Sequence, residues 1–243
     1  MRRVDRGGLR LLQFSSLSKV EGLVCYLTTR PIDVRDIDDA RRVFAAIDAD
    51  PAKMVRVRQA HKAQVAVIGE FVLPERIEVD GLVTDWPNQP LFLRAADCSL
   101  VVVVDEAKRA LGVAHAGWKG AARGIVVNLI KTMHKQYGSK PSALRAAIGP
   151  TISMANYPVG PEVPAAFLQR RAWAKDYVHA RAGQLYFDLA GVNARFLKEC
   201  GIPQERIEVS RMCTFDNHGL LHSYRHAGTD SGHHGVVAYW QDA

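Results

Sequence analysis

The sequence has few cysteines, and none of them stand at close spacing. Its four are Cys25, Cys98, Cys200 and Cys213, with no C-x-x-C pair. This excludes a small disulfide framework and a zinc ribbon, and it favours a reducing compartment. Apolar runs such as 100–104 are far shorter than the ~20 residues that cross a bilayer, and the start of the chain is too polar for a signal peptide. We therefore expect a cytoplasmic protein that does not enter a membrane.

The sequence also lacks a run of basic residues interleaved with aromatic ones, which argues against a nucleic-acid groove. The chain is nevertheless basic, with 32 Lys and Arg against 25 Asp and Glu, a net charge of +7 and a pI near 9.4. Part of the excess lies in the first ten residues, and the rest is scattered arginine. This predicts a basic, solvated surface, with attraction of anionic substrates such as phosphate as the alternative.

No repeat, low-complexity tract or linker divides the 243 residues, and the balance of 48% hydrophobic and 23% charged residues is ordinary for a globular domain. Helical and strand periodicities interleave irregularly, which predicts one mixed α+β domain over 1–243 rather than a regular doubly wound sheet. The expected helices are 36–49, 120–138, 160–174 and 189–201, the last capped by Asp188 and Gly201. The expected strands are 24–28, 55–57, 65–68, 99–104, 110–115, 144–148, 206–214 and a short one at the C-terminus.

Two reactive side chains lie at the open ends of an expected hairpin. Cys98 precedes the apolar strand 99–104, and His115 ends the strand 110–115. If Asp105 pairs with Lys108, Cys98 faces His115 at about 4.5–5.5 Å, close enough for a thiolate–imidazole pair or for two ligands of one metal. A slip of one residue would place them on opposite faces.

His61, expected at a turn between two strands, is the third candidate. Together the three residues would form a His/Cys/His set, and three protein ligands with an open fourth position are typical of catalytic zinc. Cysteine with two imidazoles also suits copper. Taken singly, Cys98 could be a buried small hydrophobe, His115 a hydrogen-bonded core histidine and His61 a surface residue. The separations of 37 and 17 residues match no local zinc motif.

Six segments of the sequence carry a resemblance to a known family. They are "RQAH" at 58–61, "AADCSLVVV" at 95–103, "VAHAGWKG" at 113–120, "AAIGPTISMANYPVGPEV" at 146–163, "CTF" at 213–215 and "HSYRHAG" at 222–228. In this order they resemble the bacterial laccase-domain family, also called the multicopper polyphenol oxidase or purine nucleoside phosphorylase family. The resemblance implies a single α/β/β/α domain. It also implies a metal held by His61, Cys98 and His115, with zinc preferred and copper as the alternative.

The resemblance implies several activities. One is phosphorolysis of adenosine, inosine, guanosine or methylthioadenosine, together with adenosine deamination. Others are copper-dependent polyphenol oxidation and peptidoglycan editing, and a metal-free Cys–His hydrolase remains a further alternative. The nine histidines include no His-x-His pair of the kind expected for a trinuclear copper cluster. We therefore favour one zinc and group-transfer or hydrolytic chemistry on a nucleoside and phosphate, in a monomer or weak homodimer.

Further residues near these motifs are candidates for substrate chemistry. Asp97 is a possible proton carrier, a cap or an ion-pair partner. Lys119 and Arg225 could supply the cationic pocket that phosphate needs. Tyr224 and Trp118 could stack on a base or pack in the core.

Two segments depart from the family pattern. The family usually has a Gly/Ser-rich loop after "TTR", but here 28–40 is short and acidic. Near the C-terminus, His233 stands where the family has arginine. These departures predict a changed substrate or reduced phosphorolysis.

Overall fold

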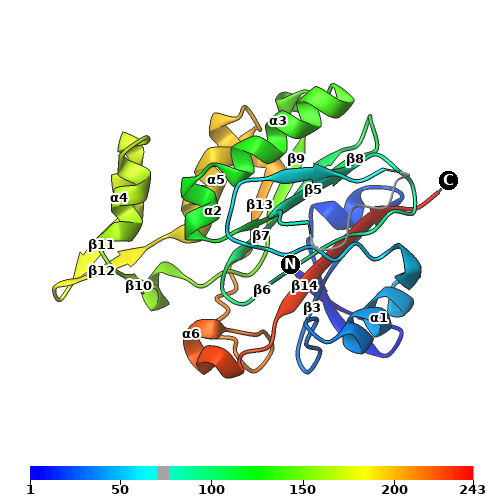
Figure 1. Ribbon diagram of the computed structural model, residues 1–243, viewed down its shortest axis with the longest axis horizontal. Helices are drawn as coiled ribbons and strands as arrows, with labels where there is room; N and C mark the ends of the chain where they lie inside the picture. Colours follow the sequence, from blue (N-terminus) through cyan, green and yellow to red (C-terminus); the bar gives the residue numbers. More distant parts are fainter. Residues whose placement is uncertain (70–76, 243) are drawn as a thin grey trace.

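Two stacked β-sheets lie between layers of helices in the computed structural model, which describes residues 1–69 and 77–242 (Figure 1). The first sheet has five strands, in the order β1-β2-β3-β14-β6. Its strands are β1 (Arg2–Arg6), β2 (Leu9–Gln13), β3 (Leu23–Thr28), β14 (His234–Trp240) and β6 (Leu91–Ala95). All of its neighbouring strands are antiparallel.

The second sheet has six strands, in the order β13-β9-β7-β8-β5-β4, and carries the predicted hairpin at its centre. Its strands are β13 (Ile207–Val209), β9 (Arg145–Ile148), β7 (Ser99–Asp105), β8 (Ala110–Ala116), β5 (Gly81–Thr84) and β4 (Val65–Val67). The β13–β9 and β4–β5 pairs are parallel, and the others are antiparallel.

The apolar run of β7 is buried on both faces, which explains why it does not alternate with polar residues. Val101 and Val103 pack in the cluster that contains the helices, while Val102 and Val104 pack in the cluster between the two sheets. A third cluster buries the far face of the five-stranded sheet against α1 (Ile37–Ala46). The expected α/β/β/α arrangement is therefore confirmed.

The helices cover the outer faces of the two sheets. Figure 1 shows α1 beside the five-stranded sheet, and α2, α3 and α5 over the six-stranded sheet. These three helices are α2 (Trp118–Ala122), α3 (Ile125–Tyr137) and α5 (Leu189–Glu199). Asp188 caps α5 as predicted, since its carboxylate accepts the Gly191 N–H at 2.8 Å. The helix predicted over 120–138 is divided, because Gly124 adopts a φ of +88° between α2 and α3.

Several elements differ from the sequence predictions. Residues 1–13 form β1 and β2, two strands that are absent from the expected set, and 178–187 contribute to a small sheet that was not predicted. This sheet has the order β10-β12-β11, and α4 (Glu162–Leu168) lies beside it. Its strands are β10 (Pro158–Val159), β12 (Gln184–Phe187) and β11 (Val178–Arg181).

One predicted strand does not form, and another is shorter than expected. The stretch 55–57 forms no strand, although neighbouring Arg58 makes a single bridge to Glu78. The stretch 206–214 is a strand only over β13. A one-turn α6 (Tyr224–Ala227) and short 3₁₀ turns complete the described chain. The turns are Leu17–Lys19, Pro51–Lys53, Pro141–Ala143, Met154–Asn156, Ala172–Tyr177, Gln204–Arg206 and Gly228–Asp230.

The register of the β7–β8 hairpin differs from the prediction by two residues. Asp105 pairs with Ala110, not with Lys108, and Leu100 pairs with His115. The turn is longer because the Lys108 N–H bonds to the Asp105 carboxylate at 3.1 Å and Arg109 takes a φ of +48°. A shift of two residues preserves the face of each side chain, so Cys98 stays on the side of His115 as a diagonal neighbour.

Within residues 1–69 and 77–242, no helix combines the length and apolar character that crossing a membrane requires.

Candidate metal centre

The structure brings together the three side chains that the sequence singled out. Cys98 immediately precedes β7, His115 lies on β8, and His61 lies in the loop that precedes β4. One ligand atom from each of the three lies within 4.8 Å of the other two, and the two imidazole centroids are 4.9 Å apart. His115 is buried, Cys98 is half-buried and His61 is exposed. The set is therefore reachable from solvent through His61.

Asp80 organises two of the three candidate ligands from the segment just before β5. Its carboxylate is fully buried and accepts the backbone N–H groups of Ala60, His61 and Lys62 at 3.1, 3.1 and 2.7 Å. The same carboxylate contacts His115 Nδ1 at 2.8 Å. Engaging Nδ1 leaves Nε2 of His115 as the nitrogen for a metal, and carboxylates orient ligating histidines in this way.

The loop that carries His61 is held in a strained conformation. His61 has a φ of +54°, an uncommon left-handed value for a residue other than glycine. Besides the bonds to Asp80, the His61 carbonyl accepts the Arg123 Nη1 donor at 2.7 Å. Asp80, just before β5, and Arg123, just after α2, thus hold His61 in place, and strain of this kind occurs at sites whose geometry must be maintained.

Gly117 provides the space in which Cys98 and His61 meet. A Cβ atom at this position would lie 2.6 Å from Cys98 Sγ and 3.0 Å from His61 Nδ1. Both distances are too short for a side chain, so only glycine fits between β8 and α2 without displacing a candidate ligand.

The electrostatics of the site favour a positive charge between Cys98 and Asp80. Burial alone would lower the pKa of His115, but the Cys98 sulfur and the Asp80 carboxylate raise it to about 9. Burial and the neighbouring His115 lower the pKa of His61, so its imidazole is neutral at pH 7, the form that binds metals. Two imidazoles, one thiol and a buried carboxylate behind them fit a zinc or copper ion, with His61, Cys98 and His115 as the residues that would hold it.

Asp97 connects the Cys98 turn to the C-terminal segments. It is buried with a φ of +84°, and its two carboxylate oxygens accept the Thr214 hydroxyl and, at 2.6 Å, the backbone N–H of Arg225. Both oxygens are thus occupied by structural donors, which favours the cap among the roles expected from the sequence.

The predicted substrate-binding residues lie around this centre on exposed positions. Lys119 Nζ lies 5.5 Å from the centroid of the Trp118 ring, and Lys119 contributes to lowering the pKa of His61. Arg225 Nη1 donates to the Pro158 carbonyl at 2.9 Å, with its guanidinium 5.2 Å from the Tyr157 ring centroid. Tyr224 is 57% exposed, so it is not a core residue.

Three residues of the site, Asp80, Gly117 and Tyr157, are not among the candidates expected from the sequence. Tyr157 lies in the quoted segment 146–163, and both burial and the neighbouring Cys98 raise its pKa. Asp80 stands beside Gly81 in a stretch interpreted as a loop, and no local pattern connects it to residues 20 and 35 positions away. The "HAGW" motif contains Gly117, but its role depends on the two side chains that converge there.

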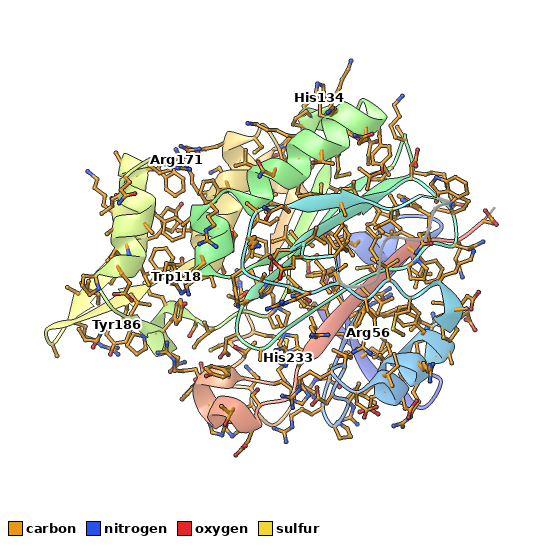
Figure 2. All side chains as sticks on the ribbon, in the orientation of Figure 1. Arg56, Trp118, His134, Arg171, Tyr186 and His233 are labelled. Atoms are coloured by element: carbon orange, nitrogen blue, oxygen red, sulfur yellow. The ribbon has the colours of Figure 1, made fainter. Side chains whose placement is uncertain are left out.

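His233, the residue at which the sequence is expected to depart from the family pattern, lies at the lower end of β14 (Figure 2). Its backbone N–H donates to the Asp33 carboxylate at 2.9 Å. Burial, with Arg94 and Arg35 nearby, lowers the pKa of His233 to about 4. Its imidazole is therefore neutral at pH 7 and does not reproduce the charge of an arginine.

An α/β/β/α fold with a solvent-reachable His/Cys/His donor set defines a class of metal-binding domain. The chain belongs to the family described as multi-copper polyphenol oxidoreductase laccase, whose model matches residues 32–241.

Relatives of known name cover nearly the whole chain. A purine nucleoside phosphorylase of Bacteroides thetaiotaomicron is 29% identical over 92% of this chain and 93% of its own length. Adenosine deaminase RL5, from an unknown prokaryotic organism, is 30% identical over 92% of this chain and 96% of its own length. The structure of the hypothetical protein YfiH of Bacillus licheniformis matches with a TM-score of 0.86 and 26% identity, covering 96% of both chains.

Proposed function

We propose that this protein is a zinc-dependent purine nucleoside enzyme that cleaves purine nucleosides by phosphorolysis and deaminates adenosine. The convergence of His61, Cys98 and His115 within 4.8 Å at a solvent-reachable position carries the proposal. It is supported by two relatives, one named a purine nucleoside phosphorylase and the other an adenosine deaminase, that each match 92% of this chain.

The roles of the chain's own residues follow from their contacts. His61, Cys98 and His115 would hold the ion, and a zinc ion held there would supply Lewis acidity for activating water or polarising an oxygen of the substrate. Asp80 fixes the tautomer of His115 and the conformation of the His61 loop. Asp97 keeps the Cys98 turn attached to α6, rather than carrying a proton.

Lys119 and Arg225 bind the phosphate. Phosphorolysis brings a phosphate oxygen to C1′ of the ribose while the bond from C1′ to the base breaks, so positive groups must hold the phosphate dianion near the sugar. Both side chains are exposed beside the centre, and neither forms an ion pair within the described residues. Tyr224 offers an exposed ring on which a purine can stack.

The neutral His233 weakens phosphate binding relative to an arginine at the same position. We expect the His233→Arg variant to lower the KM for phosphate in phosphorolysis, with little change in adenosine deamination, which uses no phosphate. Steady-state kinetics at varied phosphate concentration measures both effects. An unchanged KM for phosphate would refute this part of the proposal.

The family description also names copper oxidase chemistry, and the donor set itself suits copper. Within the described residues, however, only one group of three or more His, Cys, Asp or Glu side chains has its ligand atoms close together. A multicopper site needs several such groups, so a single ion and non-redox chemistry fit the chain better.

Metal content and product analysis test the proposal together. Purified wild-type protein should contain about one zinc per chain, and adenosine with phosphate should give adenine, with hypoxanthine from the deaminated nucleoside. The Cys98→Ala and His61→Ala variants should lose both metal and activity. Cys200→Ala, which changes a half-buried cysteine of the helical core, is the matched control and should keep both.

Other outcomes would replace the proposal. Oxygen uptake with phenols and several coppers per chain would establish the oxidase. Activity that survives chelators, with covalent labelling of Cys98, would establish a metal-free Cys–His hydrolase. A zinc-loaded protein that forms no product from any purine nucleoside would leave the proposal without support.

A further inference from the structure

A groove separates α4 from α2 and α3 beside the candidate metal centre, and one of its wall residues, Lys119, is also a candidate for phosphate binding at that centre. It consists of two hollows of about 440 and 170 Å³ that share Ala122, Arg123 and Arg170 in their walls. In Figure 2, the labelled Trp118 and Arg171 lie toward opposite ends of the gap beside α4. Since the hollows share walls, one elongated ligand can occupy both.

The groove is strongly basic. Its walls carry five cationic side chains and one carboxylate, that of Glu162; the cations are Lys119, Arg123, Lys131, Arg170 and Arg171. In the part of the chain that the structure describes, four of the five form no ion pair. The exception, Arg171, lies 3.6 Å from Glu199, which also lies 3.6 Å from Arg195. The Glu199 carboxylate is thus shared by two guanidinium groups, and its single negative charge does not cancel the positive potential of the groove.

The smaller hollow combines these cations with an apolar wall. Val127, Phe167 and Phe196 line it, and no acidic residue does. The Arg171 guanidinium lies 5.9 Å from the Phe196 ring centroid. A site with cationic groups over an apolar wall fits a ligand that carries several negative charges and a flat or apolar part.

We propose that this groove binds a short chain of phosphate groups, either free or carried by a nucleoside. Several cations spread over two connected hollows match several linked phosphates better than one, because a single phosphate would engage only one hollow. The hollows have the size of a small-ligand site. A nucleic acid would also need aromatic rings exposed at successive positions along the groove, whereas the aromatic wall here is confined to Phe167 and Phe196 at one end and Trp118 at the other.

Arg123 connects the groove to the metal centre. Arg123 lines both hollows, and its guanidinium donates to the His61 carbonyl at 2.7 Å. A phosphate that attracts this guanidinium competes with the bond that restrains the His61 loop. Occupancy of the groove therefore changes the environment of His61, whatever reaction the centre performs.

Calorimetric titration of the full-length, metal-loaded protein at low and at physiological salt tests the proposal, with tripolyphosphate, ATP, adenosine and a single-stranded RNA as probes. We expect tripolyphosphate and ATP to bind, and we expect the heat measured with adenosine to be unchanged when groove residues are substituted. The double variant Lys131→Gln/Arg170→Gln, which changes two exposed residues outside the metal centre, should weaken both by at least tenfold. Lys135→Gln, one helical turn beyond Lys131 on α3, is the matched control and should bind like the wild type.

The Cys98→Ala variant separates the groove from the metal centre. It should retain the affinity for tripolyphosphate, because its change lies outside the groove. If Cys98→Ala instead loses this affinity while the Lys131→Gln/Arg170→Gln variant retains it, the anion binds to the metal and the proposal is overturned. Tighter binding of ATP than of tripolyphosphate would identify the ligand as a phosphate chain carried by a nucleoside. Equal binding of the two would identify it as a free phosphate chain. Absence of binding, or tighter binding of a single-stranded RNA than of either probe, would refute it. Tripolyphosphate is not a nucleoside, so its binding involves no nucleoside turnover, and failure of the enzymatic proposal would not affect that result.

Discussion

The Asp80→Asn substitution gives the sharpest test of how the centre is built. In the wild type, one carboxylate accepts four hydrogen bonds: one from each of three consecutive backbone N–H groups at 60–62 and one from His115 Nδ1. An amide keeps only one acceptor oxygen and turns an NH₂ group toward two of these donors. The substitution changes few atoms, but it removes two bonds in either orientation of the amide.

The size of the effect follows from these bonds. A hydrogen bond to a charged group contributes about 1.5–3 kcal/mol, so the loss of two lowers the free energy of unfolding by about 3–6 kcal/mol. For a chain of this length, we expect a fall in Tm of about 10–20 °C. Carboxylates behind ligating histidines typically contribute 10- to 100-fold to metal affinity, and we expect a loss in that range.

The assay is a competition titration of metal-free protein with zinc and a coloured chelator, at a temperature where circular dichroism shows that the variant is folded. Asp105→Asn is the control. This carboxylate is also buried on the hairpin but accepts the Lys108 N–H at the opposite end from Cys98. The control should lose stability and keep zinc affinity. A folded Asp80→Asn variant with wild-type zinc affinity would refute the argument that Asp80 positions the ligands.

Three further predictions concern other parts of the chain. Gly117→Ala should lower zinc affinity at least tenfold in the same titration, since its Cβ would lie 2.6 Å from Cys98 Sγ, whereas Gly219→Ala, with no atom within 4 Å, should not. Burial holds the pKa of His234 at about 3, so the folded state excludes a proton that the unfolded chain binds below about 6.5. Stability measured by denaturant unfolding should therefore fall by up to about 1.4 kcal/mol per pH unit below 6.5 from this group, and less steeply in His234→Phe. Asp188→Ala should lower the free energy of unfolding by about 1 kcal/mol through loss of the α5 cap.

Each of these three predictions would be contradicted by a specific result. Equal zinc affinity of the two glycine variants would show that the close approach at position 117 relaxes without cost. An identical pH slope in the wild type and the His234→Phe variant would show that other groups cause the acid sensitivity. An unchanged unfolding midpoint for Asp188→Ala would show that solvent replaces the cap.

Local features of the sequence sufficed to predict the main elements. The 3.6-residue period predicted α1 and α3, because each buries one face against a sheet, and the capping residues Asp188 and Gly201 predicted α5. The apolar runs predicted β7 and β8, since strands covered on both faces carry few polar residues. The layered arrangement and the three candidate ligands depended in addition on the resemblance of six segments to a family. The strands β1, β11 and β12 lacked a comparable signal, because much of their surface is exposed or half-buried.

The sequence by itself thus determined the fold class, the central hairpin and the identity of the three metal-binding candidates. Only the tertiary structure decided the hairpin register, because a side chain in the turn captures the Lys108 N–H and lengthens the loop. It alone also revealed Asp80 behind two of the ligands and the basic groove beside α4. The Asp80 contacts and the groove arise between residues far apart in the chain. Sequence periodicity indicates which face of a helix or strand is buried, but it does not indicate which distant side chain packs against that face.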